Sequence, residues 1–160
     1  MSIKRCKKNW NCTSKENLFE LANRLNTLCE SLHTLYDINF GGCCYTAYCI
    51  AKALEHFNVE FSLVIFDRVQ NLKYIKSIKD LHGSVDHCAI VLPGNTDKYQ
   101  MINCDSEDFK GCYQTYVTSS SEILEYYLNN EWNDRYNSDY NTLVQTQIER
   151  ICHEFVDNLH

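Results

Sequence analysis

Two adjacent glycines, Gly41 and Gly42, separate two long runs of apolar residues that both repeat with helical spacing. The chain has only five glycines and one proline, so this pair is a strong interruption of the periodicity. Before it, the apolar repeat of residues 18–36 follows the capping-box pattern Thr13-x-x-Glu16. After it, residues 43–57 carry a broad apolar face. We therefore expect a long amphipathic helix, a sharp turn and a second, largely buried helix.

The middle of the chain is typical of β-structure. Residues 59–66 are rich in β-branched and aromatic side chains, and two further strand-like segments, 86–92 and 98–103, flank the turn residues 93–97. Helical patterns return at 119–128 and 139–159, whereas 104–118 has no clear pattern. Helices and strands that do not alternate predict an α+β fold, with helices packed on an antiparallel sheet.

Charge and length exclude several classes of protein. The 160 residues carry 15 basic and 21 acidic side chains, a formal charge of −6, so we expect one domain spanning 1–160 and no nucleic-acid partner. The N-terminal residues lack the apolar region of an export signal, and no apolar stretch reaches spanning length. We therefore expect a cytoplasmic protein that does not associate with membranes.

Ten cysteines require an explanation. Without an export signal we expect them to be reduced, and Cys29 and Cys152 fall on apolar helix faces, where a thiol acts as a small buried hydrophobe. The spacings match no zinc motif, so we expect neither metal nor cofactor. A redox or zinc site built from separate segments remains a third, weaker hypothesis; it would use Cys43, Cys44, His87, Cys88 and Cys104.

A cysteine, a histidine and an amide or carboxylate occupy positions that suit thiol catalysis. Cys43 and Cys44 fall in the first turn of the predicted buried helix, where unpaired N–H groups and the helix dipole favour a thiolate. His87 opens one strand of the predicted hairpin, and reflection about its centre sets it opposite Asn103. Asp105 lies one same-face step further along. The hairpin therefore predicts that Asn103, or less favourably Asp105, orients the His87 imidazole.

This order resembles the transglutaminase-like branch of the papain-like cysteine proteases. The family's Gly-x-Cys-aromatic element corresponds to residues 42–45, and its later apolar positions fall on Leu54 and Val59. Its histidine strand corresponds to residues 87–91, with Ala89 in place of an aromatic residue. Its next strand corresponds to residues 99–103, with Asn103 in place of aspartate. The resemblance covers about residues 40–105.

The resemblance implies a papain-like core at about 37–118, preceded by a helix at 14–36 and followed by helices within 119–159. It implies a thiol-dependent amide-bond hydrolase, a cysteine peptidase or deamidase, acting on a polypeptide without a cofactor. Its register favours Cys44 over Cys43 as nucleophile, with His87 as base. The backbone N–H of Cys44 would bind the oxyanion, with Asn39 or Tyr36 as the second donor. The alternative is a catalytically silent domain of this fold that binds a protein partner.

Overall fold

The computed structural model describes residues 14–36, 38, 42–93, 101–104, 112–130 and 138–158. Helices and strands alternate irregularly along these ranges, with two short 3-10 turns after the first strand. In chain order the elements are α1 (Lys15–Tyr36), α2 (Cys43–His56), β1 (Ser62–Phe66), η1 (Leu72–Tyr74), η2 (Ile78–Asp80), β2 (His87–Val91), β3 (Met101–Ile102), β4 (Tyr113–Tyr116), α3 (Ser120–Asn129) and α4 (Ser138–Asp157).

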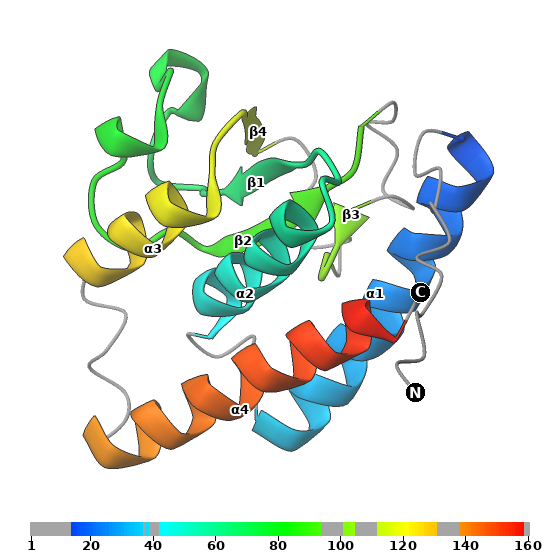
Figure 1. The fold of residues 1–160 in the computed structure, drawn as a ribbon. Coiled ribbons are helices and arrows are strands. Elements are labelled where there is room, and N and C mark those ends of the chain that lie inside the picture. The colour runs from blue at the N-terminus through cyan, green and yellow to red at the C-terminus, as the bar shows by residue number, and fades with distance from the viewer. Residues whose placement is uncertain are drawn as a thin grey trace, which may run out of the picture.

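The four described strands form one antiparallel sheet in the order β3-β2-β1-β4 (Figure 1). Strand β1 lies at the centre, where Phe66 is opposite His87 on β2 and opposite Tyr113 on β4. Strands β2 and β3 form the expected hairpin. The α+β class is therefore confirmed, and β4 falls in a segment for which no element was expected.

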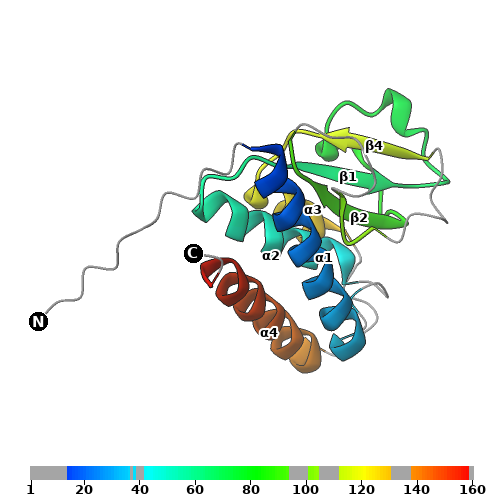
Figure 2. The same cartoon turned by 90° about the vertical axis from the view of Figure 1, so that its right-hand side faces the viewer.

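Helix α2 is the centre of the hydrophobic core. Its residues are buried almost throughout: Cys43, Cys44, Tyr45, Thr46, Ala47, Tyr48, Cys49, Ile50, Ala51, Ala53 and Leu54. All of them except Thr46 belong to one apolar cluster with the sheet residues Leu63, Ile65, Cys88 and Ile90. Figures 1 and 2 show α2 between the sheet and α4, while α3 packs along its other side. The expectation that the second helix is largely buried is confirmed.

The sheet has a second buried face, which points away from α2. Its cluster contains Val64, Phe66, Ala89, Val91 and Met101. Cys88 points towards α2, whereas His87, at the first position of the strand, lies beside Phe66 of this second face and also interacts with Cys43 at the start of α2. The start of β2 therefore presents chemically different side chains to the two sides of the sheet.

Side-chain caps fix the start of α1 and α3. At α1 the Ser14 hydroxyl accepts a hydrogen bond from the Asn17 N–H at 3.2 Å, so Ser14 caps the helix. Thr13, the first residue of the predicted capping box, lies outside the described residues. At α3 the Ser119 to Glu122 capping box is present, as its Ser-x-x-Glu pattern predicts.

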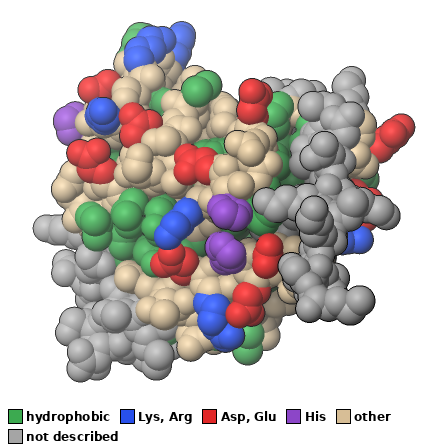
Figure 3. Space-filling model, viewed as in Figure 1, with side chains coloured by type: hydrophobic (Ala, Val, Ile, Leu, Met, Phe, Trp, Pro, Cys, Tyr) green, Lys and Arg blue, Asp and Glu red, His purple; other side chains and the backbone are tan. Residues whose placement is uncertain are grey.

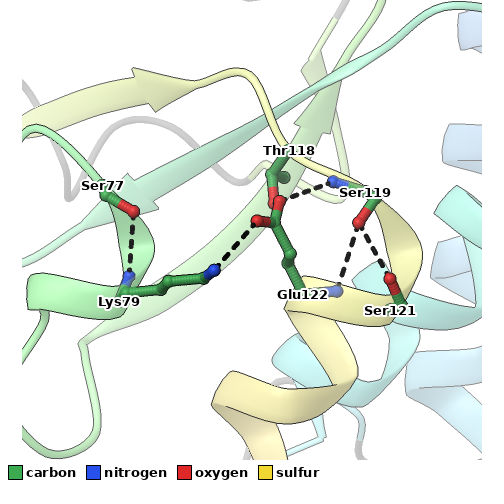
Figure 4. A network of polar contacts seen from close by, with 6 residues as sticks. All are labelled: Ser77, Lys79, Thr118, Ser119, Ser121 and Glu122. Atoms are coloured by element: carbon green, nitrogen blue, oxygen red, sulfur yellow. Dashed lines mark hydrogen bonds and ion pairs between the residues drawn. The ribbon is translucent and has the colours of Figure 1, made fainter.

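The Glu122 carboxylate also joins α3 to the loop before β2 (Figure 4). It accepts a hydrogen bond from the Thr118 hydroxyl at 2.8 Å and lies 3.6 Å from the Lys79 ammonium on η2. These contacts anchor the long connection between β1 and β2, which ends at His87.

The outer surface of α2 and α4 carries mixed charges. The His56 and His153 rings lie 5.5 Å apart between centroids, and Lys52 forms an ion pair with Glu149. Figure 3 shows two histidines side by side on this face, with acidic and basic side chains interspersed around them. Among the described residues, no helix combines the length and the apolar character needed to cross a bilayer.

Candidate active site

Gly42 allows helix α2 to begin close to the backbone of Ile38. A Cβ added at Gly42 would lie 2.9 Å from the Ile38 carbonyl oxygen and 3.0 Å from its Cα, so a larger residue would force the backbone apart. No side chain caps this helix. The first-turn N–H groups of Cys43 and Cys44 therefore lack intrahelical acceptors. Both cysteines occupy the helix start that the glycine pair predicts.

His87 is the first residue of β2 and is held on two sides. Only 5% of its surface is exposed, and its ring lies 5.9 Å from that of Phe66 between centroids. Its Nε2 forms a hydrogen bond with the main-chain carbonyl of Asn103. A carbonyl oxygen only accepts, so Nε2 carries the proton. In the neutral ring, Nδ1 is then the nitrogen that can take a proton.

Cys43 is the cysteine that His87 contacts. Hydrogen bonding from Cys88, together with hydrogen bonding and charge from His87, lowers the pKa of the Cys43 thiol well below its ordinary value in spite of burial. Burial and the neighbouring thiols raise the pKa of Cys88 in turn. Cys43 is therefore the thiol of this group that ionises most readily.

Cys44, the nucleophile favoured by the family register, is fully buried and contacts Cys88. Adjacent helix residues point about 100° apart, so only one of the two cysteines can face the imidazole. The interaction with His87 that the structure shows is the one made by Cys43.

Asn103 meets His87 through its backbone rather than its side chain. It follows β3 with φ at 64°, a left-handed conformation that asparagine tolerates better than most residues. This conformation ends the strand and accompanies the contact of its carbonyl with the imidazole. The side-chain Nδ2 is buried and has no hydrogen-bond partner within the described part of the chain. The structure thus joins Asn103 to His87, but not by the amide contact that the hairpin geometry predicts.

The predicted hairpin register was wrong. Reflection about the turn placed His87 opposite Asn103, whereas the observed ladder pairs Ile90 with Ile102 and Val91 with Met101. Continued, this ladder would set Ala89 opposite Asn103. The difference arises because β2 is buried on both faces, so the alternation of apolar residues does not select one pairing. The register of a hairpin then depends on the type and length of its turn, which the residue types did not specify.

Asn26 on helix α1 holds the end of β3 in place. Its Nδ2 donates to the Met101 carbonyl at 2.9 Å, and its Oδ1 accepts from the Asn103 N–H at 2.8 Å. One amide thus satisfies both backbone groups that flank Ile102. Because the Asn103 carbonyl contacts His87, α1 is connected to the site through this clamp. Nothing in the α1 pattern distinguishes Asn26 from its other polar residues, so the sequence analysis missed it.

Of the other predicted site residues, Tyr36 lies in the described part of the chain. Asp105 and Asn39 lie outside the described residues. Tyr36 ends α1 and packs, half-buried, against the main core. The second oxyanion donor expected from Asn39 or Tyr36 stays a prediction.

Tyr126 on α3 lies near the three thiols Cys43, Cys44 and Cys88. Its hydroxyl donates to the Gly83 carbonyl at 2.8 Å. Burial, followed by the proximity of Cys88 and Cys44, raises the pKa of its phenol. The sequence analysis did not select Tyr126, since one tyrosine among eleven carries no distinguishing signal.

A metal centre was the weakest of the hypotheses drawn from the sequence. Within the described ranges, no three histidine, cysteine, aspartate or glutamate side chains come together in a way that could hold an ion. Cys104 is partly exposed and packs against the second face of the sheet. His87 lies beside Phe66 of that face, whereas Cys88 points to the other one.

A large open hollow among the described residues lies at the far end of the sheet. It has a volume of about 1050 Å³ and is lined by Glu55, Phe61, Ser62, Leu92, Pro93 and Val117, among others. Ser62 and Val91 are at the opposite end of the β1 and β2 pair from Phe66 and His87. This hollow is therefore separate from the cysteine and histidine pair.

A scan against protein-family models, a search of curated proteins and a search of solved structures each returned no match.

Proposed function

We propose that the chain is a thiol-dependent amide-bond hydrolase, a cysteine peptidase or deamidase of the transglutaminase-like and papain-like type, with a polypeptide as substrate. Cys43 is the nucleophile in this proposal, His87 the general base and acid, and Asn103 the residue that orients the imidazole. The observation that carries the proposal is that one imidazole contacts both the Cys43 thiol and the Asn103 carbonyl.

The reaction follows from the proton positions in this group. The Asn103 carbonyl keeps the proton on Nε2, so Nδ1 receives the proton of the Cys43 thiol. The thiolate attacks the amide carbonyl carbon, and the imidazolium returns the proton to the leaving amine or ammonia. The imidazole then takes a proton from water, which attacks the thioester and releases Cys43.

These steps create a negative charge on the substrate oxygen and a positive charge on the His87 ring, and a different group of the protein lies near each charge. The first-turn N–H groups of α2 have no intrahelical acceptor and carry the positive end of the helix dipole, which suits an oxyanion. The imidazolium is stabilised by the Asn103 carbonyl dipole, which is weaker than a carboxylate. The thiolate and imidazolium pair therefore depends more on the helix dipole than in a triad with aspartate.

Peptide cleavage and deamidation can be tested together on a pooled peptide library. We expect the wild-type chain to generate new peptide termini or glutamine deamidation, Cys43→Ala and His87→Ala to abolish it, and Cys44→Ala to retain it. Cys44→Ala is the matched control, because it removes an adjacent, equally buried thiol. Equal products from wild type and Cys43→Ala would refute the proposal. Loss in Cys44→Ala alone would move the nucleophile to Cys44.

Burial of the pair favours a second candidate, a catalytically silent domain of this type that binds a protein partner. Cys43 is 2% exposed and His87 5%, whereas a substrate carbonyl must reach the sulfur directly. In this case Cys43, Cys88 and His87 stabilise the junction of α2 and β2. Unchanged library peptides, together with a loss of stability in Cys43→Ala and His87→Ala, would support this candidate.

A further inference from the structure

Three thiols meet where helix α2 begins against β2. Cys43 and Cys44 lie in the first turn of the helix, and Cys88 points from β2 towards them. All three are at most 2% exposed. Cys88 belongs to the same buried cluster as Cys43 and Cys44, and the proximity of both thiols contributes, after burial, to raising its pKa. The proposed reaction uses only Cys43, which leaves the position of Cys88 without a role in it.

We propose that Cys88 is a resolving cysteine, which forms a reversible disulfide with Cys43 when peroxide oxidises the nucleophile. The inference rests on the proposed function, because it requires Cys43 to be the reactive thiolate. The two thiols are buried in one cluster, one on the first turn of α2 and the other on the strand that faces it, and this proximity is the first requirement for such a bond. The position of Cys88, next in sequence to His87, places this control inside the site itself.

The two steps balance with hydrogen peroxide as the oxidant. The Cys43 thiolate attacks one peroxide oxygen, the O–O bond breaks, and the departing hydroxide takes a proton to give water and a sulfenic acid. The Cys88 sulfur, losing its proton, then attacks the Cys43 sulfur. The S–O bond breaks and a second water leaves. Two thiols are oxidised, one peroxide is reduced, and a dithiol reductant reverses the bond.

Cys44 cannot replace Cys88 in the second step. Adjacent residues joined by a trans peptide have Cα atoms about 3.8 Å apart, below the roughly 4.4–6.8 Å that disulfides span. The helix also turns the two side chains of Cys43 and Cys44 away from each other. Cys88 comes from another element and is not subject to this restriction. The disulfide therefore joins α2 to β2 and blocks the nucleophile.

Peroxide titration of the full chain, followed by peptide mapping, tests this inference. We expect wild type to yield a peptide pair linked through Cys43 and Cys88, which dithiothreitol reverses. In Cys88→Ala, Cys43 should proceed to sulfinic acid, which dithiothreitol does not reverse. Cys152→Ala is the matched control, since it removes another fully buried thiol and should behave like wild type. Thermal unfolding of both variants confirms that they are folded.

The outcomes separate this inference from the proposed function. If Cys43 reacts rapidly with iodoacetamide but oxidises to sulfinic acid in wild type while Cys88 stays reduced, the resolving role is refuted and the nucleophile stands. If Cys43 is neither alkylated nor oxidised faster than Cys152, both are refuted. If Cys88→Ala fails to fold, Cys88→Ser provides the same comparison.

Discussion

The main-chain carbonyl of Asn103, and not its side-chain amide, accepts the hydrogen bond from Nε2 of His87. Papain-like chemistry needs an acceptor at this nitrogen, and a backbone carbonyl can supply it from any residue that adopts the required conformation. Position 103 is therefore constrained by its φ of 64° more than by its side chain. This distinguishes the site from a triad in which a side chain orients the imidazole.

Substitutions at Asn103 should follow backbone preference. Asn103→Gly keeps the carbonyl and tolerates the left-handed conformation, so Cys43 alkylation should stay within a few-fold of wild type. Asn103→Val should cost about 1–2 kcal/mol of stability or more and slow alkylation strongly, because a β-branched residue resists this conformation. Urea unfolding and iodoacetamide kinetics provide both measurements. Equal loss in Asn103→Gly and Asn103→Val would restore a role for the side chain.

Removal of the Asn26 side chain should affect the site of Cys43 and His87, although helix α1 contributes no reacting group to that site. Asn26→Ala leaves the Met101 carbonyl and the Asn103 N–H without partners, which should cost about 1–3 kcal/mol of unfolding free energy. It should also shift the pH profile of Cys43 alkylation upwards, since His87 loses its fixed acceptor. Asn23→Ala, at an exposed position on the same helix, is the control and should change neither. A stability loss without any shift in the pH profile would limit Asn26 to a structural role.

Gly42 should be irreplaceable at the start of α2. Gly42→Ala places a methyl group against the Ile38 carbonyl and should destabilise the fold by about 1–3 kcal/mol. Gly83→Asn is the comparison, because Gly83 has φ at 67° with open space around it, and asparagine tolerates that conformation. Chemical denaturation measures both variants. A Gly42→Ala chain as stable as Gly83→Asn would show that the helix start can move.

Buried thiols away from the site should make the fold sensitive to alkali. Burial raises the pKa of Cys152 to about 12 and also raises the pKa of Cys29, so the folded chain keeps both thiols protonated. Unfolded thiols ionise near about pH 8.5. The stabilisation is therefore complete below that pH and is lost as the pH rises towards the folded pKa. Each thiol should reduce the unfolding free energy by about 1.4 kcal/mol per pH unit there.

Urea unfolding between about pH 8 and pH 10 measures this slope. In Cys152→Ala the unfolding free energy should fall less steeply with pH than in wild type, because one buried thiol is missing. An equal pH dependence in the variant and in wild type would contradict the raised pKa of Cys152. The contribution of Cys43 to stability changes with pH in the opposite direction. Because its pKa is lowered in the folded chain, Cys43 stabilises the fold at high pH, and this stabilisation is lost as the pH falls through the folded pKa.

The elements that periodicity describes well were predicted from the sequence, and the contacts between them were not. The glycine pair located the start of α2 and hence Cys43 and Cys44, and alternation located β2 and His87. Which cysteine faces His87 depends on the rotation of α2 about its axis, which the packing of the whole core sets. Asn26 reaches Asn103 across 77 positions of sequence, a separation over which no local pattern operates.

Iodoacetamide labelling of Cys43 tests the account most directly. One tryptic peptide, residues 25–52, carries Cys29, Cys43, Cys44 and Cys49, so fragment sequencing compares all four thiols within one molecule. We predict that Cys43 reacts at least about ten-fold faster than the others near neutral pH. Its rate should level off below the pH expected for an ordinary thiol, and His87→Ala should abolish the advantage. Equal rates for Cys43 and Cys29, or a faster Cys44, would contradict the assignment of Cys43 as the nucleophile.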